Sequence, residues 1–231
     1  MRIRIKFSKN GSLKYIGHLD VMRFFQKVIR RAEIDIAYSE GFSPHMQMSF
    51  AQPLGIGVTS DGEYFDMDMK SRSTSAELVR LMNEQMSDEI QVSNAVEIPS
   101  DKANKCMSLV NAADYVVSFK NADDVFYSVK DRLKAFLEQK EILALKKTKR
   151  NEEITDIRPF IYEYEVNDNN VFFKISTGSV NNIKPQLIMN TFFEQNGIDP
   201  DKVSLLIHRK EIYAETAAGF VPLYKLGEEI V

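Results

Sequence analysis

The chain has 231 residues, 44% hydrophobic and 27% charged, proportions typical of a folded globular protein rather than a disordered one. No apolar run reaches the roughly 18 to 20 residues of a membrane-spanning helix, and the first residues lack the apolar stretch of a signal peptide. A single cysteine, Cys106, excludes an internal disulfide and a cluster held by this chain alone. We therefore expect a soluble, cytoplasmic protein with no membrane contact, no metal and no cofactor of its own.

The net charge of −3 conceals blocks of opposite sign. Residues 1–50 hold nine basic and four acidic side chains, a net charge of +5. Residues 51–100 hold three basic and nine acidic side chains, a net charge of −6. Residues 101–150 are again positive and residues 151–231 negative. Such blocks either face one another within the fold or leave a local basic surface for phosphate, and the sequence favours neither.

The first half of the chain alternates between the periodicities of strands and helices. Residues 1–7 alternate apolar with basic side chains, which predicts a half-buried strand. Over residues 17–33 apolar residues recur at three and four positions, which predicts a helix. The elements expected next are a strand at 34–38, a strand around 46–50, a strand at 63–69, a helix from about 73 to 86 and a strand at 89–98.

The second half repeats this order after a connector at about residues 99–110. Its expected elements are a strand at 113–119, a helix at 122–139, a strand at 141–145, a hairpin of 162–166 with 171–176, a helix at 184–195 and a strand at 203–208. The order strand-helix-strand-strand-helix-strand predicts an α+β fold of two tandem ferredoxin-like (βαββαβ) domains, at residues 1–100 and 111–231.

The first strand carries three basic side chains on one face, Arg2, Arg4 and Lys6. In a ferredoxin-like sheet this face is open and adjoins the strand that carries Asp66 and Asp68, so we expect ion pairs across the two strands. An RNA-binding sheet of this shape stacks bases on several aromatic side chains, which this face lacks. A self-neutralised sheet face or a domain interface is therefore the favoured interpretation.

The strongest candidates for chemistry are His18 and Asp20, at the start of the first predicted helix, and His45 in a loop rich in glycine and proline. If the loop folds back, two imidazoles and a carboxylate could bind a metal or act as a general acid and base. Free N–H groups around Gly41 and the helix start could instead bind an anion. The plainest alternative is that His18 and Asp20 cap the helix and that His45 bonds a loop carbonyl.

Further residues could contact RNA or another ligand. Basic side chains form a stripe on the first helix, and a basic run follows a predicted strand in the second half, where a solvated loop or surface ion pairs are the simpler explanation. The candidates are Arg23, Lys27, Arg30, Arg31, Tyr38, Ser39, Gly41, Phe42, Lys147, Lys149, Arg150 and Arg158.

Short motifs that involve these candidates and further residues are spread along the chain: His18-Leu19-Asp20, Arg30-Arg31-Ala32, Ala37-Tyr38-Ser39, Gly41-Phe42, Pro44-His45, Ser49-Phe50, Pro53-Leu54 with Gly57, Asp156-Ile157-Arg158-Pro159, Gly178-Ser179 and Lys184-Pro185. Together they resemble the motifs of the radical-SAM-linked protein family, a domain of unknown function. The chain departs from this family at Gly17, Glu40, Ser43 and Met46, where Ser, Gln, Asn and Pro are usual.

This resemblance implies a non-catalytic accessory or substrate-binding partner of a radical SAM enzyme. Members of the family are usually encoded beside, or fused to, a cobalamin-binding radical SAM protein, which would carry the cluster and the radical chemistry. Genes for a ribonuclease of the E/G type and for ribosomal proteins often lie nearby, which implies RNA or a ribosomal component as a further partner. The residues also allow a stand-alone RNA-binding or RNA-processing protein that uses His18 and His45, and a metal-dependent enzyme acting on a small substrate.

Overall fold

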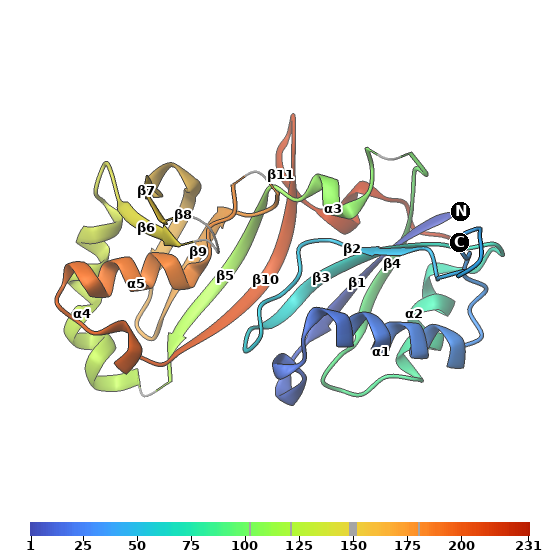
Figure 1. Cartoon of the computed structure of the whole chain (residues 1–231), viewed down its shortest axis with the longest axis horizontal. Helices are drawn as coiled ribbons and strands as arrows, with labels where there is room; N and C mark the ends of the chain where they lie inside the picture. Colours follow the sequence, from blue (N-terminus) through green and yellow to red (C-terminus); the bar gives the residue numbers. More distant parts are fainter. Residues whose placement is uncertain (102, 121, 148–151, 180) are drawn as a thin grey trace. The chain divides into compact units, whose positions relative to one another are not determined.

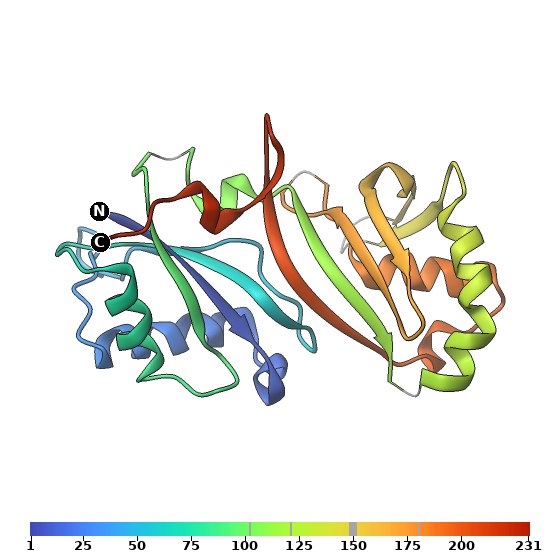
Figure 2. The ribbon, with the colours of Figure 1, turned by 180° about the vertical axis from the view of Figure 1, so that it is seen from behind.

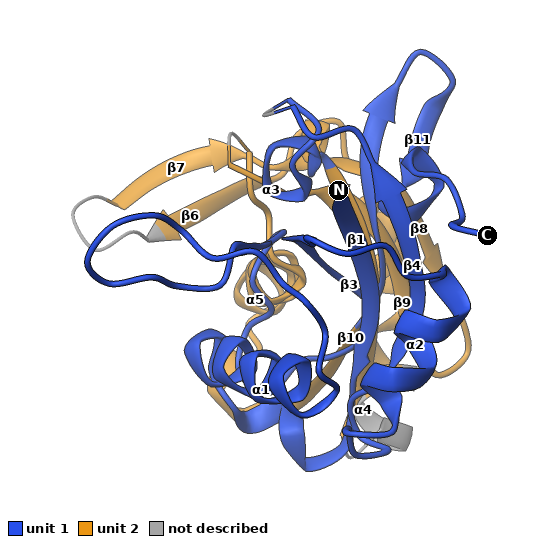
Figure 3. Cartoon of the chain, turned by 90° about the vertical axis from the view of Figure 1, so that its right-hand side faces the viewer, with its two compact units in different colours: residues 1–111, 209–231 blue, residues 112–208 orange. Residues whose placement is uncertain are grey.

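The computed structural model describes residues 1–101, 103–120, 122–147, 152–179 and 181–231. The chain forms two compact units (Figure 3): unit 1 consists of Met1–Asn111 with Arg209–Val231, and unit 2 consists of Ala112–His208. Unit 2 is thus inserted into the sequence of unit 1, and both chain ends belong to unit 1 (Figure 2). Residues 209–231 are predicted to lie in the second domain, whereas the structure groups them with residues 1–111.

Unit 1 is built on an antiparallel sheet. Its central strand β1 (Arg2–Lys9) pairs with β3 (Thr59–Asp68) on one side and with β4 (Val92–Ile98) on the other. The far edge of β3 pairs with the short strand β2 (Met48–Phe50) and neighbours β10 (Leu205–Thr216). The strand β11 (Gly219–Pro222) then forms a hairpin with β10.

One face of this sheet is apolar because strands place every second side chain on the same side. The helices α1 (His18–Arg31) and α2 (Ser75–Asn83) cover it (Figure 1). α1 buries one stripe of its surface, and Thr74 caps α2 by accepting a hydrogen bond from the Glu77 N–H at 3.2 Å. The most deeply buried residues of this core include Ile3, Ile5, Phe25, Ile29, Phe65 and Met82.

The opposite face of the sheet carries the predicted ion pairs. Arg2 contacts Asp68 at 2.7 Å and Arg4 contacts Asp66 at 2.8 Å, as the alternation of charge on β1 and β3 predicts. The expectation that this face is open is wrong, because Arg4 is only 1% exposed. Two other segments cover it: the residues that lead into the short helix α3 (Cys106–Leu109), and the 3-10 helix η4 (Leu223–Leu226). Arg4 donates hydrogen bonds to a carbonyl oxygen in each of them.

Two connecting segments of unit 1 also differ from the prediction. The strand expected at 34–38 is absent from this described segment, which forms only isolated bridges, from Ile36 to Met69 and from Tyr38 to Met46. The backbone of Ala37 donates to the Asp68 carbonyl and accepts from the Gln47 N–H, so this segment bonds at single points instead of forming a ladder. The connector expected at 99–110 contains α3.

Unit 2 also combines an antiparallel sheet with helices. The strand β9 (Asn170–Ser176) pairs with β5 (Ala112–Phe119) and with β8 (Ile161–Val166), which confirms the predicted hairpin. The helices α4 (Ala122–Leu137) and α5 (Pro185–Gln195) complete the unit. Its core includes an aromatic group, in which the ring centroids of Phe119 and Phe126 lie 5.0 Å apart and those of Phe136 and Phe192 lie 5.5 Å apart.

A separate hairpin interrupts the expected order of unit 2. The strand predicted at 141–145 corresponds to β6 (Leu143–Lys147), which pairs with an unpredicted strand, β7 (Glu152–Asp156). Taken as a whole, the protein is a mixed α/β structure dominated by antiparallel pairing. Among the described helices, none has the length and apolar character needed to cross a membrane.

Candidate functional site

The start of α1 positions two of the candidate residues. Gly17 is the N-cap and has no side chain to accept a hydrogen bond, so neither His18 nor Asp20 caps the helix as the plainest alternative expected. The Asp20 carboxylate instead pairs with Arg23 at 3.2 Å on the exposed surface. The His18 ring meets the edge of the Phe50 ring, with centroids 5.3 Å apart.

His45 is oriented by a local arrangement in the loop that follows α1. Ser39 Oγ accepts a hydrogen bond from the His45 backbone N–H at 3.1 Å and lies 2.8 Å from His45 Nδ1. Because the hydroxyl already accepts from the backbone, its own hydrogen is available to Nδ1. The hydroxyl therefore bonds the ring at Nδ1 and leaves Nε2 open. This bonding pattern fixes the ring through the side chain of Ser39 rather than through a loop carbonyl.

The structure does not bring His18 and His45 into one cavity. His18 lines a small cavity between α1 and the segment that follows β2. His45 lines a separate and larger cavity across β2 and β3, together with Arg2 and Lys105. Within the described residues no group of three or more potential ligands is placed to hold a metal ion.

The cavity of His18 adjoins a group of buried charges. Arg209 binds Glu63 through two nitrogen–oxygen contacts and donates to the Gln52 carbonyl at 2.8 Å. Lys9, only 2% exposed, donates to the Ile16 carbonyl at 3.0 Å, and its burial lowers the pKa of its ammonium group. These charges come from three distant parts of the chain, so no local sequence signal could have identified them as a group.

A second buried group lies on the other face of the unit 1 sheet. Lys6 pairs with Glu211 at 2.7 Å, and the Tyr64 hydroxyl donates to the same carboxylate at 2.6 Å. Burial and the charge of Glu211 raise the pKa of the Tyr64 hydroxyl well above its ordinary value. Together with the pairs of Arg2 and Arg4, this group forms a continuous polar layer across β1, β3 and β10.

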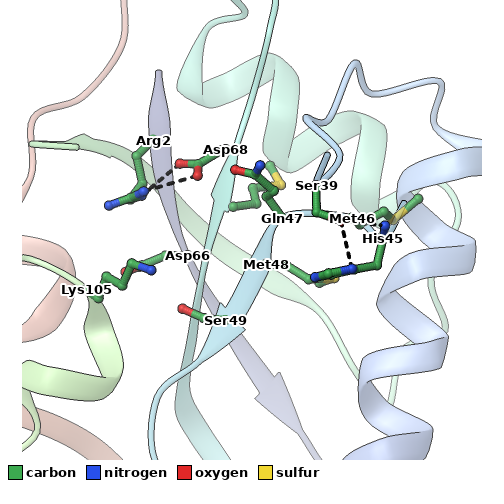
Figure 4. Close-up of a pocket in the computed structure, with 11 residues that line it drawn as sticks. Arg2, Ser39, His45, Met46, Gln47, Met48, Ser49, Asp66, Asp68 and Lys105 are labelled. Atoms are coloured by element: carbon green, nitrogen blue, oxygen red, sulfur yellow. Dashed lines mark hydrogen bonds and ion pairs between the residues drawn. The ribbon is translucent and has the colours of Figure 1, made fainter. Parts of the chain in front are cut away.

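The larger cavity has a volume of about 320 Å³ and lies entirely within unit 1. Figure 4 shows the His45 ring, held by Ser39, reaching toward the cavity from one side, with Lys105 and Arg2 on the opposite side. Lys105 is placed by the next residue, Cys106, whose N–H donates to Asp66 at 2.6 Å. The cavity therefore combines two cationic side chains, Arg2 and Lys105, with the imidazole ring of His45.

The outer face of α1 carries the basic stripe expected from the sequence. Arg23, Lys27, Arg30 and Arg31 are all exposed. Arg23 pairs with Asp20, but within the part of the chain that the structure describes no hydrogen bond or ion pair engages the side chains of the other three. Residues spaced by three and four positions share a helix face, so the three free cations form one local positive surface.

The loop after α1 also exposes two aromatic side chains. Tyr38 is 42% exposed and the Phe42 side chain is fully accessible. Gly41 takes a φ of 106°, a conformation that side chains other than glycine rarely adopt. Ser39 is committed to His45, so the remaining loop candidates present apolar and backbone groups rather than charge.

The candidates in unit 2 do not form a comparable group. The Arg158 guanidinium lies 5.6 Å from the centre of the Tyr164 ring and donates to the Ile161 carbonyl at 3.0 Å, a local structural role. Lys147 ends β6, opposite Glu152 in the register of the hairpin. Lys149 and Arg150 lie outside the described residues.

The chain as a whole is similar to a family model and to a solved structure. A family model described as "Uncharacterized protein conserved in bacteria (DUF2344)" matches residues 2–185. No curated protein matches the chain. A chain in the crystal structure of a Cbf5-Nop10-Gar1 complex is similar to 91% of this chain, with a TM-score of 0.47 and 11% sequence identity. This chain spans about half, 48%, of the length of that neighbour.

Proposed function

We propose that this chain, which belongs to the family described as "Uncharacterized protein conserved in bacteria (DUF2344)", is a non-catalytic RNA-binding accessory protein that presents its substrate to a radical SAM enzyme. The RNA-binding part of the proposal rests on the surface of unit 1. The partner enzyme rests on the motif resemblance alone. We place the complex in the cytoplasm, where a lone buried cysteine stays reduced.

The observation that carries the proposal is the free basic surface of α1. Lys27, Arg30 and Arg31 are exposed and have no partner among the residues that the structure describes, although the chain as a whole is acidic. Each cation that neutralises a phosphate releases counterions, which drives the binding of nucleic acid. Tyr38 and Phe42, which are exposed in the loop that follows α1, offer surfaces on which unpaired bases could stack.

The division of labour with a radical SAM enzyme fits the cysteine content. Cys106 is buried, and its sulfur lies 3.2 Å from the Ser49 carbonyl oxygen, so it is committed to packing in unit 1. An iron–sulfur cluster is held by several cysteines. The partner would therefore carry the cluster, and this chain would supply binding and orientation.

We also propose that both units are variants of the ferredoxin-like fold. In unit 1 the antiparallel pairing runs in the order β4, β1, β3, β2, which is the order expected of a split βαβ pattern. In unit 2 the strands β5, β9 and β8 follow the same scheme, with the β6–β7 hairpin inserted between α4 and β8.

One observation favours a second function, a stand-alone RNA-processing protein. Ser39 holds His45 at Nδ1 and leaves Nε2 open to a substrate, and a positioned imidazole is a common site of proton transfer in catalysis. His18, the proposed second histidine, lines a different cavity. RNA cleavage by the purified protein that is abolished in His45→Ala would support this function against the accessory role.

The RNA-binding proposal is tested by the salt dependence of binding to a single-stranded RNA, followed by fluorescence anisotropy. Replacing Lys27, Arg30 and Arg31 together with alanine should weaken binding and reduce the slope of log K against log salt by about 2, since each single-strand phosphate contact contributes about 0.7. The matched control replaces three exposed lysines of unit 2 with alanine, Lys120, Lys134 and Lys140. Equal affinities and slopes in both triple variants would refute the proposal that the basic surface of α1 binds RNA.

The partner is tested by capture of the tagged full chain from native cells without nuclease. A radical SAM protein recovered in stoichiometric amount, together with RNA, supports the accessory role. RNA recovered without such a protein refutes that role and leaves the stand-alone function.

A further inference from the structure

The cavity of about 320 Å³ that His45 lines in unit 1, called the larger cavity above because it exceeds that of His18, is not explained by the basic surface of α1. Its lining includes three polar side-chain groups that no other described residue engages: the Lys105 ammonium, the Ser49 hydroxyl and Nε2 of His45. All three can donate hydrogen bonds. Groups of this kind, gathered in a cavity of about 320 Å³, are typical of a small-molecule binding site.

Two carboxylates also line this cavity, but both are already neutralised. Asp66 accepts from Arg4 through both oxygens and from the Cys106 N–H. Asp68 accepts from Arg2 through both oxygens. The two carboxylates are therefore matched by the two guanidinium groups, and the charge of Lys105 is left in excess. The cavity as a whole favours an anion.

The backbone beside Lys105 and the ring of His45 are held in place before any ligand binds. Lys105 immediately precedes Cys106, which is held by the Asp66 carboxylate and by the Ser49 carbonyl. His45 is fixed through two hydrogen bonds to Ser39. Figure 4 shows Lys105 and His45 on opposite sides of the cavity. Such prior ordering reduces the entropy lost on binding.

We propose that this cavity binds a phosphate monoester, with the phosphate against Lys105, Ser49 and the edge of Arg2 and with His45 donating to the esterified group. A terminal phosphate offers three strong acceptor oxygens and close to two negative charges, which suits several donors better than a carboxylate does. The cavity volume exceeds that of the phosphate alone, so it also accommodates part of a nucleoside. The choice of a nucleotide, or of the phosphorylated end of an RNA, rests on the proposed function.

The test uses calorimetric titration of the full-length protein with adenosine monophosphate, adenosine and inorganic phosphate. We expect adenosine monophosphate to bind at least tenfold more tightly than adenosine, and Lys105→Met to weaken its binding at least tenfold. Lys105→Arg should restore part of the affinity, because the charge is kept. Lys70→Met, which removes an exposed lysine of unit 1 outside the cavity, is the matched control and should bind as the wild type does.

Two results would overturn the proposal. One is equal binding of adenosine and its monophosphate; the other is unchanged binding in a folded Lys105→Met variant, with folding checked by its melting temperature. The alanine variant of Lys27, Arg30 and Arg31 should keep its affinity for the mononucleotide while losing affinity for RNA, so failure of the α1 surface and failure of the cavity are distinguishable. RNAs with and without a terminal phosphate then distinguish a free mononucleotide from the phosphorylated end of an RNA. If the ligand is an RNA end, the terminal phosphate should increase the affinity for RNA, and Lys105→Met should abolish this increase.

Discussion

Arg4 and Asp66 form a two-point ion pair in the interior of unit 1, with Nε 2.8 Å from Oδ1 and Nη2 3.2 Å from Oδ2. The side chains are only 1% and 3% exposed. Arg4 also donates to the carbonyls of Leu223 and Asn104, and Asp66 accepts from the Cys106 N–H. The pair therefore joins two strands of the sheet to the two segments that cover them.

Asp66→Asn should destabilise the protein by about 3–5 kcal/mol, because it leaves the Arg4 charge buried without a counter-charge. The free energy of unfolding in urea measures the loss. Asp68→Asn is the matched control, since its pair with Arg2 is more exposed, at 26% and 12%. Equal losses in the two variants would contradict a special role for the buried pair.

Gly62→Ala should destabilise the protein by about 1–3 kcal/mol through overpacking. A Cβ at Gly62 would lie 2.7 Å from the Lys210 carbonyl oxygen and 2.8 Å from the Glu211 Cα, so backbone would have to move. Thermal unfolding of Gly62→Ala and Gly55→Ala tests this. The second variant meets only an ordinary contact at 3.6 Å, and a similar fall in melting temperature for both would contradict the expected clash.

The stability of the protein should fall above about pH 10 partly because of Tyr64. Its pKa is raised in the folded state by burial and by the Glu211 charge. The stabilisation from its neutral hydroxyl is complete below the unfolded-state pKa of about 10 and is lost as the pH rises above it, because only the unfolded chain then releases the proton. Tyr64→Phe should lose less stability than the wild type between pH 9 and pH 11, and parallel curves would disprove the assignment. Tyr15→Phe, at an exposed position, is the matched control.

Cys106 should resist alkylation in the folded protein. Its side chain is inaccessible, and burial raises the pKa of its thiol, so little thiolate is present and no reagent reaches it. Reaction then requires unfolding, and Asp66→Asn should accelerate it about 100-fold if it costs 3 kcal/mol. Mass spectrometry of iodoacetamide-treated protein follows the rate. Rapid labelling of the native wild type would contradict this view.

The sequence was sufficient where a pattern involves neighbours in a regular element. The alternation of Arg2 and Arg4 against Asp66 and Asp68 predicted both ion pairs, because residues on paired strands face one another at every second position. The stripe of α1 was predicted from the three- and four-residue spacing of a helix, and the hairpin of β8 with β9 from two strand patterns on either side of a turn.

Contacts that depend on the path of loops could not be predicted in this way. Nothing near Arg4 in the sequence indicates that Leu223 and Asn104 cover it and bury the face expected to be open. Whether His18 and His45 meet likewise depends on the path of the loop between them, and in the structure they line separate cavities. Lys105 was overlooked because its place in the cavity is set by Cys106 and the distant Asp66.

The insertion of unit 2 has a consequence for the protein as it emerges from the ribosome. Unit 2 has its whole sequence once residue 208 is made, but unit 1 still lacks Arg209, the counter-charge of Glu63. It also lacks Ile230, whose backbone N–H and carbonyl bond the first residue of α2, Ser75. The nascent chain therefore has the whole sequence of unit 2 before that of unit 1, and Glu63 on β3 has to wait for its counter-charge until residue 209 has been made.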